Sequence, residues 1–320
     1  EKKMIVSINP ATEEEINSFR EMNEADIDKI INSSHSEFLN WRETSFSNRS
    51  YKMKKAAEVL RKNIEKYSEV MTLEMGKPIK QSRAEIEKCA WVCDYFAENA
   101  EEFLRIEVIK SDASHSYVTF QPLGVILAVM PWNFPYWQVF RFAAPNLMAG
   151  NAGVLKHSAN VTGCALAIEE VFREAGFPEN LFRTLIISSK KVDGVIKNNK
   201  VRAVTLTGSV PAGKAVAQSA GSVLKKSVLE LGGSDPYIIL EDADIEKAAE
   251  NCKNIFYCVH IPYPRWEREA RELLAVSIEA AVKHNIKLVF PGNVYVYGYP
   301  EYNPVDENHP WKAHTKKGKI

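Results

Sequence analysis

The sequence has no excess of charge of either sign and no apolar run long enough to cross a membrane. Its 41 basic and 41 acidic residues give a formal net charge of +0, so no long-range field recruits nucleic acid or an anionic lipid surface. The longest apolar stretch, Val125–Met130, falls far short of the roughly 20 residues of a membrane-spanning helix. The first residues lack the apolar segment of a secretion signal. We therefore expect a soluble, cytoplasmic protein with a neutral small-molecule or protein partner, and no nucleic-acid or membrane partner.

Cysteine is scarce and follows no metal or disulfide pattern. The five cysteines form an odd set without CxxC spacing, which favours a reducing compartment. Cys89 and Cys93 lie one helical turn apart on an apolar stripe that runs from Ile86 to Phe103. Because no further ligand is close in sequence, core packing is favoured over metal binding at this pair.

The chain does contain enough apolar residues for a sizeable core. Its 320 residues are 45% hydrophobic, which allows two or three domains. Apolar residues step by threes and fours from Met53 to Met71, and this spacing predicts one long amphipathic helix that ends at Gly76 and Pro78. The stripe from Ile86 to Phe103 predicts a second helix.

After about residue 115, short β-rich runs alternate with helical ones. The predicted strands cover residues 117–121, 125–130, 153–156, 181–187, 203–207 and 237–240. The predicted helices between them cover residues 139–148, 161–175 and 212–221. Such alternation is typical of βαβ units. It predicts an α/β fold with a Rossmann-like parallel sheet that has helices on both faces.

The composition changes abruptly after Asn254. Two prolines in 261–266 precede a predicted helix over 267–284 and a predicted strand over 286–290. We therefore expect one region over residues 1–254, with long helices in 51–104 and a βαβ part in 117–254. A short α/β tail over 255–320 is expected to follow.

Three segments at predicted strand ends are candidates for binding or catalysis. Pro131–Pro135 follows a buried strand and contains Asn133, which is either a side-chain donor or a turn former. Residues 207–213 join a strand to a helix with small residues, which suits either phosphate binding or a tight turn. Glu230, followed by two glycines, is a general base or a solvated surface acid. No GxGxxG fingerprint is present.

Taken together and in order, these motifs resemble the aldehyde dehydrogenase superfamily over about residues 5–253. The segments that carry the resemblance are Asn9-Pro10-Ala11-Thr12, Glu74-Met75-Gly76-Lys77-Pro78, the Pro131–Pro135 block, Lys156, Thr207-Gly208-Ser209 and Glu230-Leu231-Gly232-Gly233. The sequences in and around these motifs are most similar to those of bacterial NAD(P)-dependent succinate-semialdehyde dehydrogenases. The resemblance implies oxidation of an aldehyde to a carboxylic acid, with succinate semialdehyde as the best-matched substrate.

The resemblance also implies roles for individual residues. Asn133 would hold the oxyanion, Glu230 would act as general base, and Arg141 would bind the distal carboxylate of the substrate. An arginine on a surface helix is the alternative for Arg141. The residues implied to lie at the cofactor, which is NAD or NADP, are Trp132, Lys156, Ser158, Thr207, Gly208, Ser209 and Gly232. Ala159 stands where NAD-preferring members often have glutamate, which leaves room for NADP and implies use of both cofactors or a preference for NADP.

The family's nucleophilic cysteine has no clear counterpart in this sequence. It should lie near Pro264, and the nearest thiol, Cys258, lacks the flanking glycine and glutamine. Cys258 is therefore only a weak candidate, and we expect little or no aldehyde oxidation by this chain. The tail from about Trp266 instead resembles a segment of extended short-chain dehydrogenases of the epimerase and dehydratase group. A non-catalytic nucleotide-binding or interaction module, from a fused or truncated gene, is the alternative.

Overall fold

The computed structural model describes residues 4–233, 254–256 and 266–289. By its internal contacts the chain divides into two units, residues 1–234 and 235–320. The boundary predicted at residues 254 and 255 remains a prediction.

In the first unit, four α-helices precede the strands of the main sheet in the sequence. These are α1 (Glu24–Trp41), α2 (Phe46–Lys62), α3 (Ile64–Met75) and α4 (Ile79–Phe103). The prediction of one helix from Met53 to Met71 was wrong, because the backbone leaves the helical conformation at Asn63 (φ −107°, ψ 24°). The Asn63 side chain donates to the carbonyl of Val59 at 3.1 Å, and such local bonds favour helix ends.

The ends of the later helices agree better with the sequence. Gly76 closes α3 in the left-handed conformation, at φ 72°. The helix predicted over the second stripe is α4, on which Cys89 and Cys93 are fully buried. Their assignment to the core is therefore confirmed. Helix α1, which begins with a capping box between Asn23 and Asp26, was not predicted.

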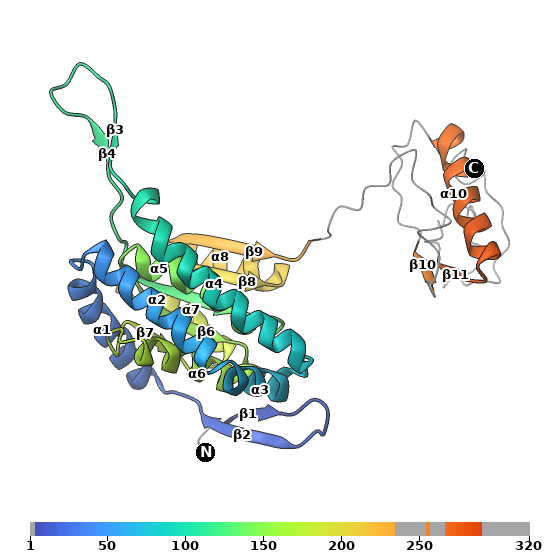
Figure 1. The fold of residues 1–320 in the computed structure, drawn as a ribbon, viewed down its shortest axis with the longest axis horizontal. Helices are drawn as coiled ribbons and strands as arrows, with labels where there is room; N and C mark the ends of the chain where they lie inside the picture. The colour runs from blue at the N-terminus through green and yellow to red at the C-terminus, as the bar shows by residue number, and fades with distance from the viewer. Residues whose placement is uncertain (1–3, 234–253, 257–265, 290–320) are drawn as a thin grey trace. The chain divides into compact units, whose positions relative to one another are not determined.

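A five-stranded parallel sheet forms the centre of the unit (Figure 1). Its strands are β5 (Val125–Met130), β6 (Ala152–His157), β7 (Phe182–Thr184), β8 (Val201–Gly208) and β9 (Lys226–Leu231). The order β7-β6-β5-β8-β9 reverses direction between β5 and β8, as in a doubly wound fold. The predicted Rossmann-like α/β fold is thereby confirmed, while the strand predicted over 237–240 lies outside the described residues.

Helices connect successive parallel strands of the sheet as crossover segments. Helices α5 (Trp137–Met148) and α6 (Thr162–Glu174) follow β5 and β6, with α2 packed against both. Helix α8 (Val210–Ser222) connects β8 to β9 and contacts the short helix α7 (Val192–Lys197). One apolar core runs through these layers, and its largest fully buried side chains include Trp41, Tyr67, Phe140 and Phe172.

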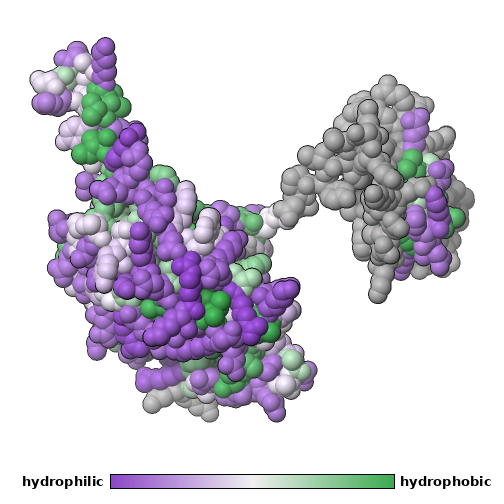
Figure 2. Space-filling model, viewed as in Figure 1, coloured by the Kyte–Doolittle hydropathy of each residue, from purple (hydrophilic) through white to green (hydrophobic). Residues whose placement is uncertain are grey.

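Two small hairpins extend from this body. Strands β1 (Met4–Ile8) and β2 (Glu15–Arg20) pair antiparallel, and so do β3 (Glu107–Val108) and β4 (Tyr117–Val118). The strand predicted over 117–121 is therefore shorter than expected. Only Tyr117 and Val118 pair with the two residues of β3, and residues 119–121 do not belong to a strand. Figure 2 shows apolar side chains at this second hairpin, and they include Ile106, Val108, Ile109, Tyr117 and Val118.

The second unit contains a small βαβ arrangement among its described residues. Strand β10 (Asn254–Phe256) pairs in parallel with β11 (Lys287–Val289), and helix α10 (Trp266–Lys283) lies between them in sequence. The helix and strand predicted for the tail are confirmed in these bounds. Among the described residues, no helix combines the length and apolarity that crossing a membrane requires.

Candidate active site

The candidate residues gather at the carboxyl ends of the central strands. The Pro131–Pro135 loop follows β5, Ser158 follows β6, and Ser209 follows β8. Because all of these strands are parallel, their carboxyl ends lie along one edge of the sheet. The strand order reverses between β5 and β8, and in doubly wound folds the ligand binds at the carboxyl ends of the strands where this reversal occurs.

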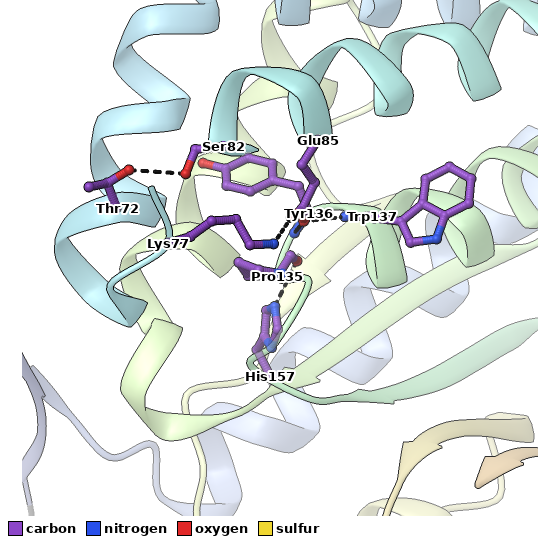
Figure 3. Close-up of polar contacts among 8 residues, drawn as sticks. All are labelled: Thr72, Lys77, Ser82, Glu85, Pro135, Tyr136, Trp137 and His157. Carbon is purple, nitrogen blue, oxygen red and sulfur yellow. Dashed lines mark hydrogen bonds and ion pairs between the residues drawn. The ribbon is translucent and has the colours of Figure 1, made fainter. Parts of the chain in front are cut away.

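Glu85 fixes the loop after β5 from the side of helix α4. Its Oε1 accepts the main-chain N–H groups of Tyr136 and Trp137, each at 2.9 Å. Its Oε2 forms an ion pair with Lys77 (Figure 3). The carboxylate therefore caps the N-terminus of α5, where the helix dipole favours negative charge. The Lys77 ammonium also lies 3.8 Å from the ring centroid of Phe134.

His157 holds the same loop from the end of β6. Its Nε2 lies 2.9 Å from the carbonyl oxygen of Pro135, and its Nδ1 lies 2.9 Å from the main-chain nitrogen of Ser158. A neutral ring with the proton on Nε2 donates to Pro135 and accepts at Nδ1 from the Ser158 N–H, which is shared with the carbonyl oxygen of Met130, 3.2 Å from Nδ1. Burial lowers the pKa of His157 to about 4, so the ring is neutral at physiological pH.

Lys156 points to the opposite face of β6 from its buried neighbour His157, since successive side chains alternate along a strand. It is partly buried, and burial lowers the pKa of its ammonium group. In the register of the sheet Lys156 is paired with Val129, one residue before the end of β5. The Ser158 hydroxyl donates to Oδ1 of Asn160 at 2.8 Å. A partly desolvated cation at a strand end suits a ligand that carries hydroxyl or phosphate oxygens.

The turn after β8 leads directly into the N-terminus of α8. Ser209 caps this helix, with its Oγ accepting the N–H of Ala212 at 3.4 Å. Gly213 lies in the first turns of α8, where a Cβ atom would come within 2.4 Å of Leu231 on β9. Helix and strand thus pack closely, and small residues leave the helix N-terminus accessible. The Ser209 hydroxyl, the N–H of Val210 at the start of α8 and Lys156 are donors that fit a dinucleotide diphosphate and ribose.

A groove of about 510 Å³ runs between α5 and strands β5, β8 and β9. Arg141, Thr207 and Glu230 line it, together with apolar residues such as Phe142. The Arg141 guanidinium donates to Oε1 of Gln138 at 2.9 Å and to the Thr207 hydroxyl at 3.3 Å. Thr207 and Glu230 are register neighbours on β8 and β9. The groove therefore combines an apolar wall with two cations, Arg141 and Lys226, and the carboxylate of Glu230, a combination suited to a short acid with an apolar chain.

The structure brings together most, not all, of the residues singled out from the sequence. Trp132 and Asn133 are exposed on the loop after β5, and Gly208 follows Thr207 at the end of β8. Gly232 comes directly after β9. Cys258 lies outside the described residues. Cys89, Cys93 and Cys164 are buried, and burial raises the pKa of each thiol, so these three are unsuited to nucleophilic attack.

Sequence reasoning missed the roles of Lys77, Glu85 and His157. Lys77 belongs to the motif Glu74–Pro78, and the family resemblance implies no role for it. The signal for Glu85 was its place beside Ile86 on the stripe that faces the core. A carboxylate at such a position needs a buried partner.

Comparison with known proteins identifies the family of this chain and several relatives with similar sequences. The family model described as "Aldehyde dehydrogenase family" matches residues 1–259. The probable NADP(+) succinate-semialdehyde dehydrogenase of Synechocystis is 50% identical over 244 residues, covering 76% of this chain and 54% of that protein. An NADP(+) succinate-semialdehyde dehydrogenase of Mycobacterium bovis is 47% identical over 247 residues, with coverage of 76% and 54%.

A solved structure with a similar fold is the succinic semialdehyde dehydrogenase from Streptococcus pyogenes in complex with NADP+. It is 34% identical to this chain, with a TM-score of 0.74, and the match covers 86% of this chain and 63% of that one. The chain thus spans about half the length of the curated relatives it matches.

Proposed function

Since the chain belongs to the aldehyde dehydrogenase family, we propose that its first unit binds NADP or NAD at the carboxyl edge of the sheet. The observation that carries this proposal is the Ser209-capped N-terminus of α8 at the reversal of strand order, with Lys156 on the same edge. Lys156 would hold the ribose, and Ser158, Thr207, Gly208, Ser209 and Gly232 would surround the rest of the cofactor. Relatives named for NADP(+) support the preference for this cofactor.

Calorimetric titration of the whole chain with NADP and with NAD tests this proposal. We expect saturable binding, tighter for NADP, that is lost in Lys156→Ala. The matched control is Lys54→Ala, which removes an exposed lysine paired with Glu98 on the outer helices. If the folded chain binds neither nucleotide, the proposed function is wrong.

The proposed substrate is succinate semialdehyde, with the groove beside α5 as its site. The Arg141 guanidinium would pair with the distal carboxylate, and Phe142 would contact the short carbon chain. Saturation-transfer NMR with succinate, which has the same carboxylate, checks this assignment. We expect the signal in the wild type and its loss in Arg141→Gln. An unchanged signal in the variant would exclude Arg141 as the ligand.

The proposed reaction is oxidation of the aldehyde to the carboxylate, with water as the source of oxygen. Asn133 would donate its amide N–H to the carbonyl oxygen as negative charge develops there, and Glu230 would remove a proton from water. Bound NADP would supply a nicotinamide ring that accepts hydride. We propose that this chain oxidises aldehydes poorly or not at all, since the described cysteines are buried and Cys258 lacks the expected neighbours.

We also propose that the protein is a cytoplasmic homo-oligomer. The location is supported by the buried free thiols of Cys89, Cys93 and Cys164, which suit a reducing compartment. Self-association is supported by the exposed apolar side chains of the β3–β4 hairpin, among them Val108, which is 84% exposed. Light scattering that shows a monomer would refute the oligomer.

A further inference from the structure

The loop after β5 exposes its side chains while buried polar groups hold its main chain. Trp132 and Phe134 are 51% and 46% exposed, and Asn133 between them is also exposed. These side chains are only about half buried, so apolar packing alone does not fix their direction. In contrast, Lys77, Glu85 and His157 are each less than a tenth exposed.

All three buried groups act on the segment that ends this loop. Glu85 accepts two N–H groups at the start of α5, and Lys77 neutralises Glu85. His157 donates to the Pro135 carbonyl, which lies at the junction of loop and helix. Figure 3 shows that Glu85 and His157 approach this junction from opposite sides. The other end of the loop is fixed by Met130, whose carbonyl accepts the N–H of Ser158 at 3.0 Å.

A buried ion pair such as Lys77–Glu85 adds little to the free energy of unfolding. Desolvation of an ion pair often cancels its attraction, and apolar residues of similar size can replace such pairs without loss. A buried polar network does, however, select one main-chain geometry, because each donor and acceptor must be satisfied. The network is therefore better suited to hold one conformation of an exposed loop than to stabilise the core.

We propose that Lys77, Glu85 and His157 are positioning residues that hold Asn133 toward the carboxyl edge of the sheet. This inference rests on the proposed role of Asn133 as the donor to the carbonyl oxygen. None of the three residues needs to touch substrate or cofactor. His157 follows Lys156 directly, so the strand that would hold the cofactor ribose also fixes the loop that carries the oxyanion donor.

¹⁹F NMR of the whole chain labelled with 5-fluorotryptophan tests the proposal without any ligand. Trp132→Phe identifies the loop resonance, and buried Trp41, which donates to the Leu147 carbonyl at the far end of α5, reports whether the fold is intact. In Glu85→Ala and His157→Leu we expect the Trp132 resonance to shift toward its position in the unfolded chain while the Trp41 resonance stays in place. Glu87→Ala is the matched control, because Glu87 lies on the same helix but is exposed and pairs with Arg61.

Conservative variants separate positioning from general destabilisation. Glu85→Gln keeps an acceptor for the two N–H groups, and His157→Gln keeps a donor for the Pro135 carbonyl, so each should shift the Trp132 resonance less than its apolar counterpart. These two variants decide the test if the apolar ones fail to fold. An unshifted Trp132 resonance in the variants that fold would overturn the proposal, and so would simultaneous displacement of Trp41 in all of them. Failure of the wild type to bind NADP would refute the proposed function but leave this result standing.

Discussion

The Glu74 carboxylate accepts the main-chain N–H of Cys164 at 2.8 Å, across ninety residues of sequence. Its other oxygen accepts the N–H of Gly163 at 2.8 Å and the hydroxyl of Ser7 at 2.7 Å. Glu74 thus caps α6, while Lys77 in the same short motif neutralises Glu85, which caps α5. The motif that begins at Glu74 therefore fixes the starts of two helices that follow adjacent strands of the central sheet.

Removing the carboxylate of Glu74 should destabilise the protein. Glu74→Ala leaves two N–H groups and one hydroxyl without their acceptor, and we expect the free energy of unfolding to fall by on the order of 3 kcal/mol. Urea denaturation followed by circular dichroism measures this change. Glu69→Ala, an exposed position on the same helix, should have little effect; equal losses in both variants would contradict the capping role.

Adding a methyl group at Gly163 should disturb the same cap. A Cβ atom there would lie 2.7 Å from Oε1 of Glu74, so we expect Gly163→Ala to lower the free energy of unfolding by roughly 1 to 3 kcal/mol. Helix propensity alone predicts the opposite sign. Gly194→Ala in α7, where the added Cβ meets nothing within 4 Å, should be neutral or stabilising. Thermal melts of the two variants distinguish these outcomes.

The free energy of unfolding should decrease at acidic pH because His157 is buried in its neutral form. Burial lowers the pKa of His157 to about 4 in the folded chain, against roughly 6.5 when unfolded. Between these values the unfolded chain binds a proton that the folded chain excludes. The contribution of His157 is therefore complete above the upper value and declines by about 3 kcal/mol as the pH falls to the lower one.

The comparison that isolates this effect is between the wild type and His157→Gln. Urea midpoints measured near pH 7 and near pH 4 should fall further for the wild type than for the variant, since carboxylates titrate in both. An equal decrease of the urea midpoint in the wild type and in His157→Gln would show that His157 does not control the pH dependence of stability.

The thiols of Cys89, Cys93 and Cys164 should be protected in the native protein. All three are buried, and burial raises their pKa values, so little thiolate is available to react. Iodoacetamide labelling followed by peptide mass spectrometry should modify them only after denaturation. Modification of any of the three at the rate of a free thiol, under native conditions, would contradict their placement in the core.

The sequence predicted those elements whose pattern is local. The continuous apolar run of β5 and the stripe of α4 each identify a buried element, and the Pro131–Pro135 block could be placed at a strand end. The break at Asn63 could not be found in this way, because α2 and α3 continue one apolar stripe on either side of it. The polar contacts that Asn63 makes where α2 ends leave no trace in that spacing.

By itself, the sequence determined the fold class, the family and the edge of the sheet where the candidate ligand-binding residues gather. Only the tertiary structure showed what Glu85 and His157 bind, since the main-chain groups of Tyr136 and Pro135 lie 51 and 22 residues away from them in the chain. Lys77 lies eight residues from Glu85, but the burial of that ion pair also depends on how the segments pack. A charged or titratable residue looks the same in sequence whether it is solvated or buried. Its function is set by the desolvation it undergoes and by the main-chain groups it meets, and both depend on how separate segments pack together.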